Sequence, residues 1–132
     1  MSLTNTSEDV VCGLDVDTVV RAYLTCAAWA STVGEDDTPC DDLGLDFSLD
    51  ALERAENDVR VFLGVCKLRG IDLETCGLDA KQVGHDLWLT RNGHGAGFWD
   101  RGLGATGEAL SALARDMGMC DVYVGDEELE LA

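Results

Sequence analysis

The stretch GHDLWLTRNGHGAGFWDRG, residues 84–102, decides the fold that this sequence predicts. Residues 85–91 alternate between polar and apolar side chains, which is the period of a β-strand. Asn92 and Gly93 follow, and this dipeptide favours the two-residue turn of a β-hairpin. Residues 96–100 can form the return strand. The segment therefore predicts an antiparallel hairpin over residues 85–100.

Two helices are predicted before this hairpin. The first begins near Asp15 or Asp17, since either carboxylate can cap a helix, and its apolar residues recur at helical spacing. The second begins at Ser48, another good N-cap, and ends at Gly70, which can adopt the left-handed conformation that closes a helix. Between them, residues 35–46 form an acidic stretch that we expect to be a solvated loop.

A third helix and a last strand are predicted after the hairpin. The helix spans about residues 105–117, with Thr106 as its cap, and residues 121–124 form the strand. Leu129 and Leu131 can add a short edge strand. The order is α-α-β-β-α-β. The fold class is α+β, with a small antiparallel sheet, made of the hairpin and the C-terminal strand, packed against about three helices.

The chain length indicates one domain over residues 1–132, with residues 1–14 as a loosely ordered leader. Its hydrophobic content of 46% is enough for a packed core. No apolar stretch approaches the roughly 18 residues of a membrane span, and the N-terminus lacks the pattern of a secretory signal. The expected location is the cytoplasm.

The net charge is the strongest compositional feature. The chain has 26 acidic and 9 basic residues, which give a formal charge of -17. Such a field repels nucleic acids and anionic membranes, so we expect no direct nucleic-acid partner and no membrane partner. The acidity has two explanations, solubility in a high-salt cytoplasm or imitation of a polyanion that occupies the basic groove of a DNA-binding protein.

The six cysteines do not predict a cofactor or a metal site. No CxxC motif occurs, and the spacings of zinc ribbons and zinc fingers are absent. Proximity could still pair Cys12 with Cys40. No Walker A, GxGxxG, GxSxG or HExxH motif is present either. We therefore expect no cofactor, and we favour a protein without catalytic residues.

The predicted hairpin is the candidate binding site, because it concentrates aromatic, basic and histidine side chains. On a two-residue turn, Trp88 and Trp99 lie on the face of the hairpin opposite its apolar core residues. The candidate partner-binding residues are Trp88, Arg91, Asn92, His94, Trp99, Asp100 and Arg101. His85 can pair with Asp100, although no nucleophile is visible beside them. In the competing interpretation, Trp88 covers Gly97 across the strands and the segment is structural.

The run over residues 84–102 is similar to a signature of small proteins of tailed bacteriophages and their prophages, a family of unknown function. The resemblance extends to residues 22–29 and 121–126. It implies a viral or prophage origin. The leading hypothesis is a non-enzymatic phage-type protein that binds a host protein through the hairpin, and the acidic field would speed its encounter with a basic partner. The alternatives are a protein or enzyme that binds a nucleotide or phosphorylated metabolite at the hairpin tip, and an acidic nucleic-acid mimic.

Overall fold

A computed structural model describes residues 9–33, 35–93, 97–98 and 102–132. This part of the chain contains four α-helices and three small antiparallel hairpins, so the predicted α+β class is confirmed. The numbers and order of the elements differ from the prediction. The structure adds a helix where a strand was expected and has no single sheet within the described residues.

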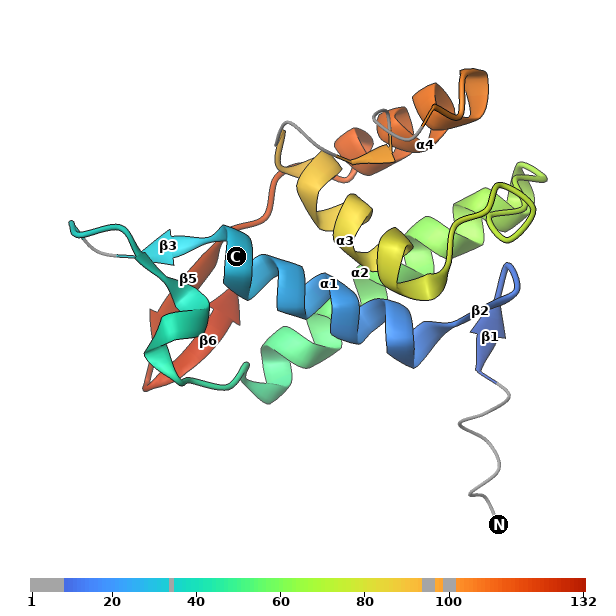
Figure 1. The fold of residues 1–132 in the computed structure, drawn as a ribbon. Coiled ribbons are helices and arrows are strands. Elements are labelled where there is room, and N and C mark those ends of the chain that lie inside the picture. The colour runs from blue at the N-terminus through green and yellow to red at the C-terminus, as the bar shows by residue number, and fades with distance from the viewer. Residues whose placement is uncertain (1–8, 34, 94–96, 99–101) are drawn as a thin grey trace, which may run out of the picture.

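The helices build most of the core. They are α1 (Val16–Ala30), α2 (Leu49–Leu68), α3 (Ala80–Arg91) and α4 (Ala105–Asp116). Helix α1 lies in the middle of the molecule, packed against α2 and α3, and α4 packs on α3 (Figure 1). The first two helices begin as predicted. Asp15 accepts a hydrogen bond from the Thr18 amide, and Ser48 accepts one from the Ala51 amide.

The strands form three separate pairs. These are β1 (Val10–Val11) with β2 (Leu14–Asp15), β3 (Thr32–Val33) with β4 (Thr38–Pro39), and β5 (Val122–Gly125) with β6 (Glu128–Leu131). The β5–β6 hairpin confirms the predicted last strand and its short neighbour. The β1–β2 hairpin places residues 10–14, the last part of the predicted loose leader, next to the start of α1 in a paired structure. The predicted solvated loop contains β4 and a 3-10 helix, Cys40–Leu43, in which Cys40 is buried.

The predicted hairpin over residues 85–100 is wrong where the structure describes it. Residues 85–91 belong to α3, and Gly97 and Phe98 lie outside any strand. The helix has a strong start, because Asp79 and Gln82 form a reciprocal capping box. The same residues that alternate with period two also fit a helix. Leu87, Trp88 and Arg91 are spaced by one and three positions and are all buried.

The cap of α4 also differs from the prediction. Gly104, and not Thr106, is the N-cap residue, and no side chain caps this end of the helix. The helix ends near Gly118, as predicted, where a φ of 82° favours glycine. Its apolar face, including Leu110 and Ala114, is buried against the rest of the core.

The cysteines are part of this core and do not cross-link it. All six are free thiols, so Cys12 and Cys40 are not paired. Cys26, Cys40, Cys66 and Cys120 are buried. Among the described helices, none combines the length and the apolar character that crossing a membrane requires.

Candidate functional site

The structure places the two central residues of the predicted site inside the protein. Trp88 is 1% exposed and Arg91 is 4% exposed. Helix α3 turns both side chains toward α1 and the core, whereas the predicted strand would have turned Trp88 outward. These two residues therefore cannot form an open binding surface in this fold, and the predicted site is corrected at these two positions.

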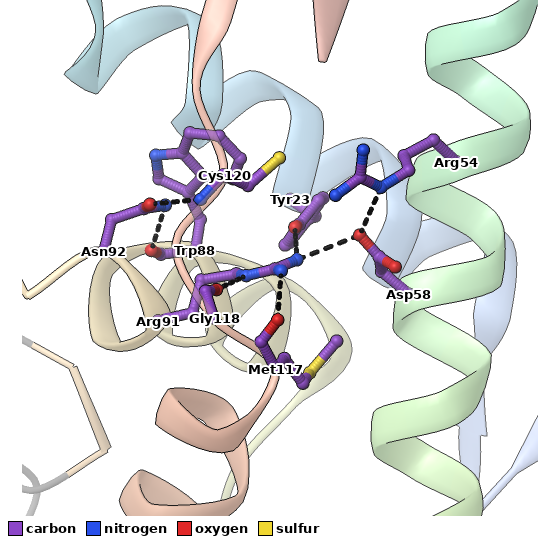
Figure 2. Close-up of polar contacts among 9 residues, drawn as sticks. All are labelled: Tyr23, Arg54, Asp58, Trp88, Arg91, Asn92, Met117, Gly118 and Cys120. Atoms are coloured by element: carbon purple, nitrogen blue, oxygen red, sulfur yellow. Dashed lines mark hydrogen bonds and ion pairs between the residues drawn. The ribbon is translucent and has the colours of Figure 1, made fainter. Parts of the chain in front are cut away.

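Arg91 ties four parts of the chain together. Its Nη1 donates to the Tyr23 hydroxyl at 2.7 Å and to Asp58 Oδ2 at 2.9 Å. Its Nε donates to the carbonyl of Gly118 at 2.7 Å, and Nη2 donates to the carbonyl of Met117 at 3.0 Å. Figure 2 shows the guanidinium between α1, α2 and the end of α4. Because four of its five N–H donors are used internally, Arg91 is a structural residue.

Trp88 and Asn92 continue this structural role. The Trp88 ring meets the Tyr23 ring edge to face, with centroids 5.3 Å apart. The Asn92 side chain donates to the Trp88 carbonyl at 3.0 Å and accepts from the Cys120 amide at 2.8 Å. Asn92 thus caps α3 and fixes the chain that enters β5. Trp88 does not cover Gly97 across two strands, because neither residue is in a strand.

Four of the predicted site residues, His94, Trp99, Asp100 and Arg101, lie outside the described residues, so the predicted pairing of His85 with Asp100 lies outside them as well. Gly97 and Phe98, which follow His94 and precede Trp99 in the sequence, are closely packed against Thr90. The Phe98 amide donates to Thr90 Oγ1 at 3.2 Å. A Cβ atom on Gly97 would lie 2.1 Å from the same oxygen, so only glycine fits there.

The described residues offer little for covalent or metal chemistry. Burial raises the pKa of the Cys26 thiol to about 11 and that of the Cys66 thiol to about 12. Both therefore stay protonated at neutral pH, and a thiol is a poor nucleophile. No group of three His, Cys, Asp or Glu residues with metal-binding geometry occurs in the part of the chain that the structure describes.

An open cavity of about 420 Å³ lies next to the buried tryptophan. Its wall comes from the end of α1 through β3, from Trp88 and Asn92, and from the segment that leads into β5. The lining residues are Ala30, Ser31, Thr32, Trp88, Asn92, Met119, Cys120, Asp121, Val122 and Tyr123. The Trp88 indole Nε1 is buried and has no hydrogen-bond partner among the described residues. In Figure 2 this nitrogen lies on the side of the ring away from Arg91.

Exposed apolar side chains surround or adjoin this cavity. Met119 is 72% exposed and Tyr123 is 48% exposed, and both line it. Val124, on the same strand as Tyr123, is 43% exposed. We call Met119, Tyr123 and Val124 the β5 patch. Large apolar side chains gathered at the rim of a cavity are typical of a surface that binds a partner.

A second groove, of about 450 Å³, lies between α1 and α3. It gathers three basic residues of this acidic chain, Arg21, Lys81 and His85, beside Thr18 and Thr25. Arg21 forms an exposed ion pair with Asp17 at 2.8 Å. Lys81 and His85 have no ion-pair partner among the described residues. Among the described residues of the 84–102 run, His85 alone lines this groove.

Sequence reasoning missed the β5 patch, because it treated residues 121–124 only as a strand of the core. A signal was present in the strand itself. Val122, Tyr123 and Val124 are three large residues in a row, and a strand with one buried face can hide only alternate ones. Val122 is buried, whereas its two successors are exposed.

Comparisons with protein-family models, with curated proteins and with solved structures found no match to this chain. The resemblance to a phage family stays a prediction, and the function has to be argued from the chain's own geometry.

Proposed function

We propose that this chain is a non-enzymatic binding protein of a tailed bacteriophage or prophage, and that it acts on a basic protein of the host in the host cytoplasm. The contact surface is the β5 patch with the adjacent cavity, in place of the hairpin surface that the sequence predicted. The observation that supports this most directly is the exposure of Met119 and Tyr123 at the edge of a cavity, with Val124 exposed on the same strand, on an otherwise acidic molecule.

The charge around the patch favours a basic partner. The β5–β6 hairpin and the residues before it carry a series of carboxylates that are exposed or half-buried, namely Asp121, Asp126, Glu127, Glu128 and Glu130. Such a field accelerates the encounter with a positively charged surface, and it makes wrong partners of like charge unfavourable. The apolar side chains then supply the contact area that turns an encounter into a stable complex.

The test is capture of host proteins on the immobilised chain, followed by affinity measurement with the captured protein. We expect Tyr123→Ala to weaken binding by about tenfold or more, because an aromatic anchor at the centre of an interface often contributes more than 1 kcal/mol. Leu68→Ala is the matched control. Leu68 is 87% exposed at the end of α2 and does not line the cavity, so its loss should leave the affinity unchanged.

The salt dependence of the same complex separates this proposal from a nucleic-acid mimic. A mimic would lose most of its affinity as the salt concentration rises, and it would tolerate Tyr123→Ala. Binding through the patch should keep a salt-resistant part that depends on Tyr123. Equal affinity of the wild type and Tyr123→Ala at every salt concentration would contradict the proposal.

The groove between α1 and α3 favours a second candidate function, binding of a phosphate-bearing metabolite or nucleotide. It replaces the hairpin tip as the anion site, because Arg91 is buried. Inorganic phosphate and a nucleoside triphosphate should each shift the imidazole resonances of His85, and Lys81→Gln should abolish the shift. Arg69→Gln, at the exposed end of α2, should leave it unchanged. No shift with either anion would exclude this candidate.

A further inference from the structure

The outer edge of β5 has backbone groups that pair with no other strand among the described residues. The Ala132 amide donates to the Asp121 carbonyl at 2.9 Å, and the register pairs Tyr123 with Glu130 and Gly125 with Glu128. In an antiparallel ladder these alternate pairs exchange the hydrogen bonds within the hairpin. Val122 and Val124 therefore direct their N–H and C=O groups away from β6.

The opposite side of the hairpin is closed. The Leu129 amide donates to the Asp46 carbonyl at 2.8 Å, and the Ser48 amide donates to the Leu129 carbonyl at 3.0 Å. The segment through Phe47 thus pairs with β6 as a parallel neighbour. On the β5 side, the nearest strand is β3, which pairs with β4 and forms no ladder with β5 among the described residues. Among the described residues, backbone hydrogen bonds close the β6 side of this hairpin and none pairs the β5 side, although β3 lies near it.

The sequence of β5 does not protect this edge. Exposed edges in soluble proteins are often blocked by a lysine, a proline or a bulge, which discourage pairing with another chain. Strand β5 reads Val-Tyr-Val-Gly and contains none of these residues, and its register with β6 is regular. Two of its side chains, Tyr123 and Val124, are exposed on opposite faces of the strand. An added strand would find apolar contacts on both faces.

We propose that an extended segment of the basic partner adds to the outer edge of β5 as a third strand. Its backbone pairs with the N–H and C=O groups of Val122 and Val124, which is the known mode of β-strand addition. One of its side chains enters the cavity of about 420 Å³ that borders Val122 and Tyr123. This inference rests on the proposed function and specifies the form of the partner.

The charge favours a basic segment over a second copy of this chain. Pairing β5 with β5 would bring two molecules of charge -17 together at a carboxylate-rich hairpin. Lysine or arginine residues at alternate positions of an added strand would instead lie beside Tyr123, on the face of the hairpin that also carries Glu128 and Glu130.

The first experiment uses a synthetic peptide of alternating lysine and valine as the probe, with a glutamate–valine peptide as its charge control. Binding is followed through the amide resonances and hydrogen exchange of β5. We expect the basic peptide to slow the exchange of the Val122 and Val124 amides by about tenfold or more, since they gain hydrogen bonds. The amides of Tyr123 and Gly125, already bonded to β6, should change little. The acidic peptide should not bind.

Two matched changes test the backbone pairing itself. Val124→Pro removes the outward N–H group without breaking a bond to β6, and it should weaken peptide binding by about tenfold. Val124→Ala shortens the same side chain but keeps the N–H group, so it should bind more tightly than the proline variant. The same peptide with N-methyl groups on alternate residues tests the partner side without any change to the protein. The peptide should lose binding when the methyl groups are on the residues whose N–H groups point toward β5. It should keep binding when they are on the residues whose N–H groups point away from β5.

The outcomes separate this inference from the proposed function. If the host protein binds wild type and Val124→Pro equally and loses affinity only with Tyr123→Ala, strand addition is overturned and the proposed function stands. If no basic peptide and no host protein binds, both fail. If the Val122 and Val124 amides become protected as the protein concentration rises, without peptide, the occupant is a second copy and the inference is wrong.

Discussion

Replacing Arg91 by methionine should lower the free energy of unfolding by about 3–5 kcal/mol, because it breaks a buried ion pair and leaves Asp58, among the described residues, with only the more exposed Arg54, at 3.4 Å. The guanidinium makes hydrogen bonds to Tyr23, Asp58, Met117 and Gly118. A methionine fills a similar volume but satisfies none of these groups. Urea unfolding, followed by circular dichroism, measures the change.

Arg54→Met is the matched control for this prediction. Arg54 also pairs with Asp58, at 3.4 Å, but its side chain is 41% exposed. Exposed ion pairs contribute little, so this variant should lose less than about 1 kcal/mol. If Arg91→Met proved as mild as Arg54→Met, the buried network would not be the connection between α3 and the rest of the core that the structure shows.

Gly84→Ala should also destabilise the protein, by about 1–3 kcal/mol, which is the usual cost of forcing extra atoms into a packed core. A Cβ atom on Gly84 would lie 2.4 Å from the Val19 carbonyl oxygen and 2.8 Å from both Ala22 Cβ and the Tyr23 amide nitrogen. These are mainly backbone atoms of α1, which cannot rotate away. Helices α1 and α3 would have to separate.

Gly64→Ala should have the opposite effect on stability. Gly64 lies within α2, and a Cβ atom there would meet nothing within 4 Å. Since alanine favours a helix over glycine by about 1 kcal/mol, this variant should be more stable than the wild type. Melting temperatures of the two variants test the pair. A stabilising effect of both substitutions would show that α1 and α3 have room between them, and would contradict the close crossing at Gly84.

Both predictions give the run over residues 84–102 a different role from the one that its composition suggests. A concentration of tryptophan, arginine and glycine resembles a binding surface, because such surfaces favour aromatic and arginine side chains. The same residue types also suit a tight helix crossing. Gly84 permits the close approach of α3 to α1. Trp88 packs against the Tyr23 ring, and Arg91 donates a hydrogen bond to the Tyr23 hydroxyl. For these three residues the structure supports packing.

Part of this fold could be predicted from the sequence because it depends on neighbours along the chain. The helix starts at Asp15 and Ser48 follow from side chains that bond to amides three residues away. The β5–β6 hairpin was predicted from two short apolar runs around a turn. The acidity is a property of composition and needs no structure, and the basic character of the proposed partner was argued from it.

The rest depended on contacts between distant residues. Residues 85–91 satisfy both a strand period and a helix period, and what decides between them is that Trp88 and Arg91 find Tyr23, Asp58 and the end of α4 inside the core. Which edge of the β5–β6 hairpin is paired is likewise invisible in the sequence, because it depends on the hydrogen bonds of Leu129 with residues 46–48. Local hydrogen bonds set where helices begin, whereas burial against distant partners set which residues became the core and which the surface.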